Sequence, residues 1–212
     1  MSPLRGWPSF PRELPDFDAA NVPSSPHELF LAWLNDAGEL ALAPHAATLS
    51  TVDTEGRPDA RVVVLKDVDQ HGWDVSFSAA SPKGSQLAAN PHVALTFFWP
   101  SRGRQVRVRG QCVPTAPEVS AADFRMRSPA SQVETFIGHQ SELLDDPAEL
   151  GAAAVEAARR IDADPALVPE FWTRYLITPE SVEFWQARRD RQHVRLLYRR
   201  SDASWLRERL WP

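Results

Sequence analysis

Cation-capable and aromatic side chains gather near the C-terminus. Glu183-Phe184-Trp185-Gln186 has the composition of an aromatic strand end, and Arg191, His193 and Arg195 follow it at alternate positions. If the second segment is a strand, these three side chains share one face, because side chains alternate along a strand. Such a face would pack poorly in a core without an anionic partner. The pattern predicts a site for an anionic, aromatic ligand, and we expect His193 to contact that ligand.

Two earlier segments combine cations with the ends of predicted elements. Arg61 and Lys66 bracket the apolar run Val62-Val63-Val64-Leu65, and a spacing of five puts them on opposite faces of a regular strand. They either reach an anion from different directions or are two solvated strand ends. Ser81-Pro82-Lys83-Gly84-Ser85 lies between a strand and a helix, where a hydroxyl, an ammonium and free N–H groups suit a phosphate. The alternative is an ordinary helix start, since the Walker spacing is absent.

Three weaker candidates complete the set. Gln105 begins a predicted strand, and its amide suits the edge of a heterocycle because it both donates and accepts hydrogen bonds. Arg127 and Ser131 are four residues apart and form a candidate anion site, and Gln140-Ser141 follows a predicted helix. For each of these residues the alternative interpretation is an ordinary solvated position on the surface without a function in binding.

Other kinds of chemistry find no support in the sequence. The single Cys112 excludes an intramolecular disulfide framework, and its place in an apolar strand indicates packing rather than catalysis. The chain has no H-E-x-x-H pattern, no nucleophile elbow and no G-x-G-x-x-G, so neither a zinc site nor a Rossmann nucleotide site is predicted. No catalytic protein nucleophile is therefore assigned from the residues.

Composition favours an ordinary globular protein. The chain has 212 residues, 43% hydrophobic and 24% charged, with a formal net charge of -5, which suits a single domain and gives no general attraction for nucleic acid or an anionic membrane. No apolar run approaches membrane-spanning length, and the N-terminus lacks the order of a signal peptide. We expect a cytoplasmic protein.

The periodicity predicts an α+β domain built around an antiparallel barrel. Residues 1–25 are rich in proline and are expected to form a flexible N-terminal arm, and residues 26–212 are expected to form the domain, with a helical insert around 117–160. An amphipathic helix is expected from Pro26 to about Gly38, and a short one over 84–89. The expected strands cover 46–52, 60–66, 73–78, 93–99, 105–113, 172–177, 181–186, 193–199 and 204–206.

Taken in order, these pieces resemble the FMN-dependent pyridoxamine 5'-phosphate oxidase family. The resemblance runs from about Pro26 to the C-terminus. It rests on the colinear series Arg61-Val-Val-Val-Leu-Lys66, Ser81-x-Lys83, Asn90-Pro91, Gln105-Val106, Arg127-x-x-x-Ser131, Gln140-Ser141, Glu183-Phe-Trp-Gln186, Arg191-x-His193-x-Arg195 and Arg209-Leu-Trp-Pro212.

The resemblance implies a split β-barrel homodimer with FMN at the subunit interface and residues of both subunits in each site. The family reaction passes a hydride from the substrate's C4' carbon to flavin N5, after which O2 is reduced to H2O2 and pyridoxal 5'-phosphate is released. The implied FMN contacts are Arg61, Val62, Lys66, Ser76, Phe77, Lys83, Gln105, Gln140, Ser141, Trp185 and Arg195. The implied substrate contacts are Lys66, Arg127, Ser131, Arg191 and His193, the last two being the candidate catalytic residues.

The departures from the family pattern fall mostly on the substrate side. Asp123 stands where the family commonly has a tyrosine that binds the substrate phosphate, and a carboxylate there would repel a phosphate unless it faces away or pairs with Arg127. Pro82 replaces the usual arginine before Lys83, Ser76-Phe77 replaces a Tyr-Thr pair, and Gln192 replaces leucine.

Two alternatives therefore stand beside the lead interpretation. One is a related flavin oxidase acting on another aromatic substrate, of the phenazine-biosynthesis type, which Asp123 and Gln192 favour. The other is a split barrel that binds a flavin without turnover. The pair Arg191 and His193 argues against that alternative, because flavin storage alone does not need groups beside a substrate ring.

Overall fold

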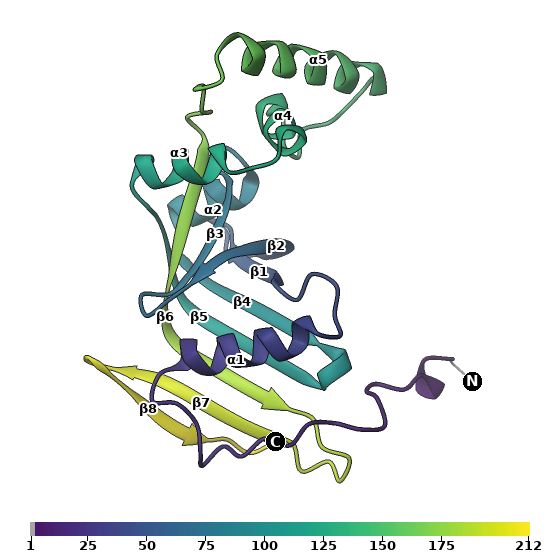
Figure 1. Ribbon diagram of the computed structural model, residues 1–212, viewed down its shortest axis with the longest axis vertical. Coiled ribbons are helices and arrows are strands. Elements are labelled where there is room, and N and C mark those ends of the chain that lie inside the picture. Colours follow the sequence, from purple (N-terminus) through teal and green to yellow (C-terminus); the bar gives the residue numbers. More distant parts are fainter. Residues whose placement is uncertain (1–2) are drawn as a thin grey trace.

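The computed structural model describes residues 3–212 and contains eight strands, five α-helices and two short 3-10 helices in that range (Figure 1). The strands are β1 (Ala46–Val52), β2 (Pro58–Val68), β3 (Trp73–Ser78), β4 (His92–Trp99), β5 (Arg104–Pro114), β6 (Trp172–Gln186), β7 (Val194–Ser201) and β8 (Ser204–Arg209). The helices are α1 (Pro26–Gly38), α2 (Pro82–Ala89), α3 (Pro117–Arg125), α4 (Pro129–Ile137) and α5 (Pro147–Ala163), with 3-10 turns over Pro3–Gly6 and Pro100–Arg102. No helix of this range is long and apolar enough to cross a membrane.

Six antiparallel strands close into a barrel. Their order is β3-β2-β1-β4-β5-β6, and pairing of β3 with β6 completes the ring, while β7 and β8 extend the sheet beyond β6. Closure removes the free edges that a flat sheet would expose. The structure confirms the predicted barrel within one α+β domain, with helices outside it.

The barrel interior follows the alternation of its strands. Val93, Leu95, Phe97 and Trp99 of β4 all point inward and are buried, as period-two patterning requires. Helix α1 closes one end, where the fully buried Phe30 meets the rings of Phe97 and Trp99 at centroid distances of 4.7 and 6.0 Å. The helix begins, as predicted, with a proline in its first turn.

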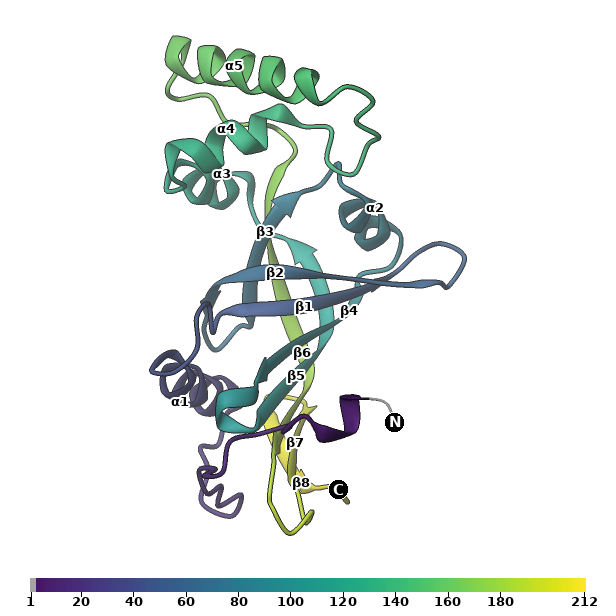
Figure 2. The same ribbon diagram turned by 90° about the vertical axis from the view of Figure 1, so that its right-hand side faces the viewer.

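The helical insert lies at the opposite end from α1. Figure 2 shows α3, α4 and α5 stacked above the barrel, with α2 beside them and the last strands at the far end. A second small core joins the insert to the start of β6, where Phe124, Phe136, Ala157 and Trp172 are buried against one another. The insert is therefore joined to the barrel at the start of β6.

Two expectations about the strands are wrong. The strands predicted over 172–177 and 181–186 are one continuous strand, β6, in which a bulge accommodates the irregular stretch: Gly110 pairs with Pro179 and Arg109 with Ser181. A Cβ on Gly110 would lie 2.0 Å from the carbonyl oxygen of Thr178, so this close approach requires glycine.

The second error concerns the strand predicted from residue 193. Strand β7 begins at Val194, and Arg191 lies in the preceding loop with φ of 64°. The alternation of Arg191, His193 and Arg195 along one strand, from which the shared face was inferred, therefore does not exist. Only Arg195 belongs to β7.

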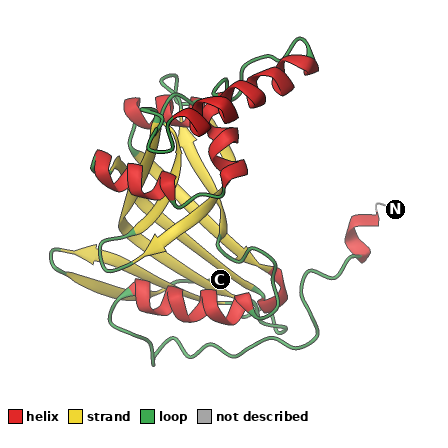
Figure 3. Ribbon diagram, turned by 45° about the horizontal axis from the view of Figure 1, so that its top comes forward, coloured by secondary structure: helices red, strands yellow, loops and turns green. Residues whose placement is uncertain are grey.

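The N-terminal segment lies along the outside of the barrel from Phe10 onward. Phe10 contacts Trp185 with ring centroids 5.8 Å apart, Phe17 packs on Trp33 at 4.9 Å, and Tyr198 donates a hydrogen bond to the carbonyl of Pro23 at 2.8 Å. Figure 3 shows this segment passing beside α1 and leading away from the barrel toward the N-terminus. That residues 1–25 form a flexible arm distinct from a domain over 26–212 stays a prediction.

Candidate active site

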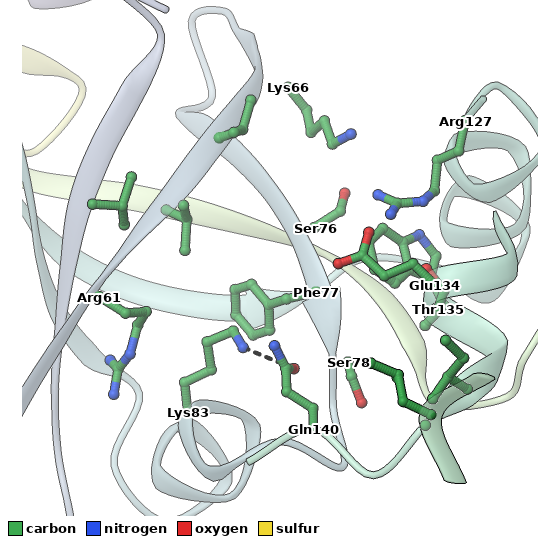
Figure 4. A pocket seen from close by; sticks show the side chains of 17 residues that line it. Arg61, Lys66, Ser76, Phe77, Ser78, Lys83, Arg127, Glu134, Thr135 and Gln140 are labelled. Atoms are coloured by element: carbon green, nitrogen blue, oxygen red, sulfur yellow. Dashed lines mark hydrogen bonds between the residues drawn. The ribbon is translucent and has the colours of Figure 1, made fainter. Parts of the chain in front are cut away.

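A cavity of about 570 Å³ lies between the barrel wall and the helical insert. Strands β2 and β3, helix α2, and the α4 region surround it (Figure 4). Its lining combines cations, amides and apolar surface: Arg61, Val62, Val63, Val64, Lys66, Ser76, Phe77, Ser78, Lys83, Arg127, Glu134, Thr135, Ile137, Gly138, Gln140, Leu150 and Trp172.

Strand β2 contributes two cations, Arg61 and Lys66, to this cavity. Leu65 pairs with Val75 and Asp67 with Asp74, so Lys66 is the extra residue of the bulged strand. Lys66 keeps the outward alternation of Val62 and Val64, which line the same cavity, and regular alternation breaks only after it. Arg61 and Lys66 line one cavity from its two ends, as Figure 4 shows, although regular spacing would set them on opposite faces.

The first turn of α2 forms one end of the cavity. Ser81 caps the helix, its hydroxyl oxygen accepting a hydrogen bond from the Gly84 amide at 3.4 Å. A Cβ on Gly84 would lie 2.2 Å from the carbonyl oxygen of Ala79, so the turn can close only around glycine. Lys83 follows the cap and projects beside Phe77, its Nζ lying 5.1 Å from the ring centroid.

Lys83 is a buried cation without a carboxylate partner. It is 8% exposed, and its Nζ donates a hydrogen bond to Oε1 of Gln140 at 3.1 Å. Burial lowers the pKa of Lys83, and the charge of Arg61 lowers it further. Among residues 3–212 no Asp or Glu forms an ion pair with it, whereas Arg61 is paired with Asp59. A buried charge without an opposite charge is costly, so this end of the cavity is suited to bind an anion.

The other end of the cavity holds Lys66 and Arg127 with Ser76 between them (Figure 4). The Arg127 guanidinium lies 4.2 Å from the ring centroid of Trp172 and donates a hydrogen bond to the carbonyl of Ser131 at 3.0 Å. Burial lowers the pKa of Arg127, opposed by the nearby carboxylates. Within the described chain, Arg127 Nε and Ser76 Oγ are buried without a hydrogen-bond partner. These unsatisfied groups also favour a polar ligand.

A second cavity, of about 510 Å³, contains the candidate catalytic pair. Arg191 and His193 line it together with Trp185 and part of the N-terminal segment. The His193 ring lies 4.9 Å from that of Trp185, and its Nδ1 accepts a hydrogen bond from the Arg188 amide at 3.0 Å. In the neutral ring the proton therefore sits on Nε2, which leaves that atom to face a ligand.

Most of the predicted site residues fall into two groups within one chain, and Gln105, Ser131, Ser141 and Arg195 line neither cavity. The cavities share no lining residue. The first cavity collects Arg61, Val62, Lys66, Ser76, Phe77, Lys83, Arg127 and Gln140. The second collects Trp185, Arg191 and His193. Gln105 of β5 pairs with Trp185 of β6 in the sheet. Arg195 forms an ion pair with Glu183 at 2.7 Å and donates a hydrogen bond to the carbonyl of Trp211 at 2.9 Å. The Ser131 hydroxyl is hydrogen-bonded to that of Ser128, and Ser141 is exposed with φ of 73°.

Several lining residues were not singled out from the sequence. Glu134 and Thr135 belong to α4, one turn after Ser131, and a helical spacing of three or four from Ser131 was the available signal. Trp172 begins β6 and gave no sign of its role, because a tryptophan at a strand start usually serves the core. Asp123 does not line the cavity; its carboxylate lies behind Trp172 and Lys66.

The fold and these cavities define a split-barrel protein whose lining residues suit an anionic aromatic ligand. Residues 36–167 match the sequence profile described as pyridoxamine 5'-phosphate oxidase, and residues 172–212 match the one described as the pyridoxine 5'-phosphate oxidase C-terminal dimerisation region. Pyridoxine/pyridoxamine 5'-phosphate oxidases of Pseudomonas paraeruginosa PA7 and Pseudomonas putida GB-1 are each 41% identical to this chain, with 91% of both sequences covered. The chain belongs to the pyridoxamine 5'-phosphate oxidase family, and its enzyme class is oxidoreductase.

Two solved structures are similar over most of the chain. PhzG from Burkholderia lata 383, in complex with tetrahydrophenazine-1-carboxylic acid, superposes with a TM-score of 0.86 at 28% identity, covering 97% of this chain and all of that one. A pyridoxamine 5'-phosphate oxidase-related, FMN binding protein from Nostoc punctiforme PCC 73102 has a TM-score of 0.73 at 18% identity, covering 89% and 98%. The second likeness supports the fold alone.

Replacing Lys83 should stabilise the ligand-free protein. At neutral pH we expect Lys83→Met to raise the free energy of unfolding by about 1 kcal/mol, because an unpaired buried charge is removed. Since the folded-state pKa of Lys83 lies below the ordinary lysine value of 10.5, the unfolded chain binds more protons between these two pKa values. The destabilisation of the wild type by the Lys83 charge should therefore fade as pH rises toward 10.5, and the stability advantage of Lys83→Met should shrink with it.

The measurement is urea unfolding of flavin-free protein at several pH values. Lys66→Met is the matched control: Lys66 lies 3.8 Å from the buried Asp123 carboxylate, so this variant should lose stability instead. A Lys83→Met protein that is less stable than the wild type at neutral pH would contradict the account.

Proposed function

We propose that this protein is an FMN-dependent oxidase that converts pyridoxamine 5'-phosphate or pyridoxine 5'-phosphate to pyridoxal 5'-phosphate, with O2 reduced to H2O2. The observation that carries the proposal is Lys83, a buried cation without a carboxylate partner at a capped helix start beside an aromatic ring. A flavin phosphate supplies the missing charge there. The family membership of the chain supports the same cofactor.

The residues of the first cavity fit FMN. Lys83 and Arg61 would hold its phosphate, and the Gln140 amide beside Lys83 adds a further hydrogen-bonding group. The buried Ser76 Oγ, which has no partner in the described chain, is available to a polar atom of the cofactor. When bound, the flavin accepts a hydride from the substrate and delivers the electrons to O2. The protein supplies orientation and a shielded cavity.

The remaining cations would orient the substrate. Lys66 and Arg127 would hold its anionic end at the far side of the cavity from Lys83. His193 and Arg191 would lie beside the substrate ring, with Nε2 of His193 free to face a ligand. Holding the reacting carbon against the cofactor provides proximity, which contributes much of the rate enhancement in reactions of this kind.

Each complete site would need two copies of the chain. Within one protomer the two groups of site residues occupy different cavities. Val62 and Val64, at the edge of the first cavity, are 68% and 46% exposed, which is unusual for valines of a barrel strand. Together with the matched dimerisation region, this supports a homodimer in which the Trp185 and His193 region of one protomer meets the Lys83 region of the other.

A second candidate is an oxidase acting on a different aromatic, of the phenazine type. The observation that favours it is the pair of carboxylates, Asp123 and Glu134, close to Lys66 and Arg127. The structural likeness to PhzG, which was solved with a tetrahydrophenazine carboxylic acid, points the same way. The higher identity to the pyridoxine/pyridoxamine 5'-phosphate oxidases keeps the first proposal ahead. A flavin-binding protein without turnover would not need Arg191 and His193 beside the ring.

The proposal predicts reduction of bound flavin by pyridoxamine 5'-phosphate. FMN-loaded protein mixed anaerobically with this substrate should lose its visible flavin absorbance, and admitting air should restore it with release of H2O2. His193→Ala should keep the flavin but slow bleaching by at least about tenfold, because the group beside the ring is removed. A flavin that binds yet stays oxidised would reject this substrate and leave the phenazine-type candidate ahead.

The shared site predicts that two inactive variants restore each other. Lys83→Met and His193→Ala proteins, unfolded together and refolded as mixed dimers, should recover about a quarter of wild-type activity, because half of the dimers are hybrid and each hybrid has one intact site. Each variant refolded alone is the control. Mixing that restores nothing would place Lys83 and His193 in the same protomer's site.

A further inference from the structure

The two ends of the first cavity differ in whether carboxylates lie close to their cations. Lys83 has no carboxylate partner among the described residues. At the opposite end, Lys66 lies 3.8 Å from the Asp123 carboxylate, and the charges of Glu134 and Asp123 both act on Arg127. An end built to attract a dianion would keep its cations free of carboxylates, because each nearby negative charge offsets part of the attraction.

Asp123 is fixed in place behind the cavity wall. It is 4% exposed, and its Oδ2 accepts a hydrogen bond from Nε1 of Trp172 at 2.9 Å. The Arg127 guanidinium lies over the ring of Trp172 in a cation–π contact. Asp123 does not line the cavity, so it acts on a ligand through Lys66, through Trp172 and through its charge. In a buried setting that charge is poorly screened.

Glu134 contributes a second carboxylate from the cavity surface. It lies on α4 and lines the cavity, and Figure 4 shows its side chain beside Arg127 and facing the interior. Its charge is the largest of the influences that raise the pKa of Arg127 against the effect of burial. Two cations therefore face two carboxylates at the end that would hold the polar group of the substrate.

We propose that Asp123 and Glu134 are specificity-determining residues that weaken the preference of this end for a dianionic phosphate. The inference rests on the proposed oxidase function and widens its range of substrates. The site then takes aromatic substrates whose polar end carries one negative charge or none, such as a carboxylate or a hydroxymethyl group, alongside the phosphate ester. Lys66 and Arg127 still orient that end, but they no longer exclude the less charged substrates.

The test compares two substrates that differ only in the phosphate. For FMN-loaded protein, kcat/KM is measured with pyridoxamine 5'-phosphate and with pyridoxamine, and their ratio is the phosphate preference. Asp123→Asn keeps an oxygen to accept the Trp172 hydrogen bond but removes the charge, so the ratio should rise about tenfold, through a lower KM for the phosphorylated substrate. Glu134→Gln should change the ratio in the same direction. Asp162→Asn, an exposed position on α5, is the charge-matched control and should leave it unchanged.

A binding measurement separates this inference from the proposed function. Equilibrium dialysis of pyridoxal 5'-phosphate and of pyridoxal against the same proteins gives the phosphate preference without turnover. If the wild type fails to oxidise pyridoxamine 5'-phosphate, the proposed function fails, and dialysis still decides the role of the carboxylates. An unchanged or lower preference in Asp123→Asn overturns the inference. Should that variant not fold, the same outcome in Glu134→Gln, which alters only an exposed side chain, overturns it.

Discussion

The uncompensated charge of Lys83 is the constraint on which the site depends. A cation that is buried at a helix start, with an amide and an aromatic ring as its neighbours, destabilises the protein until an anion arrives. Under the proposed function, the stability lost without ligand would become selectivity for a phosphate, because the same burial that makes the charge costly also leaves it unscreened. The cap at Ser81 and the glycine at Gly84 hold this arrangement in place.

The barrel supplies the rigidity that this arrangement requires. Pairing of β3 with β6 closes the ring, and Ser76 and Phe77 of β3 line the same cavity as Lys66 of β2. The helical insert adds Arg127 and completes the wall. His193 lies in the loop between β6 and β7, within the matched dimerisation region, and lines a different cavity, so a complete site is a property of the proposed dimer rather than of one chain.

The sequence predicted the positions of the helices and strands far better than the directions in which their side chains point. Period-two patterning and proline at helix starts located the strands and helices, because these signals are local. Prediction from these patterns failed where a bulge or a loop intervenes. Strand β6 is continuous through Pro179 although two strands were predicted, and His193 lies just before a strand rather than in it. The approach of Asp123 to Trp172 leaves no sequence signal, and helical spacing from Ser131 does not by itself turn Glu134 toward the cavity, since both depend on how the insert packs on the barrel.

Titration of flavin-free protein with FMN and with riboflavin tests the central claim most directly, because the two ligands differ only in the phosphate. The wild type should bind FMN at least about tenfold more tightly than riboflavin, as expected for a charge-assisted contact to a buried cation. Lys83→Met should lose most of that preference while keeping its affinity for riboflavin. A Lys83→Met protein that still prefers FMN as strongly as the wild type would contradict the account.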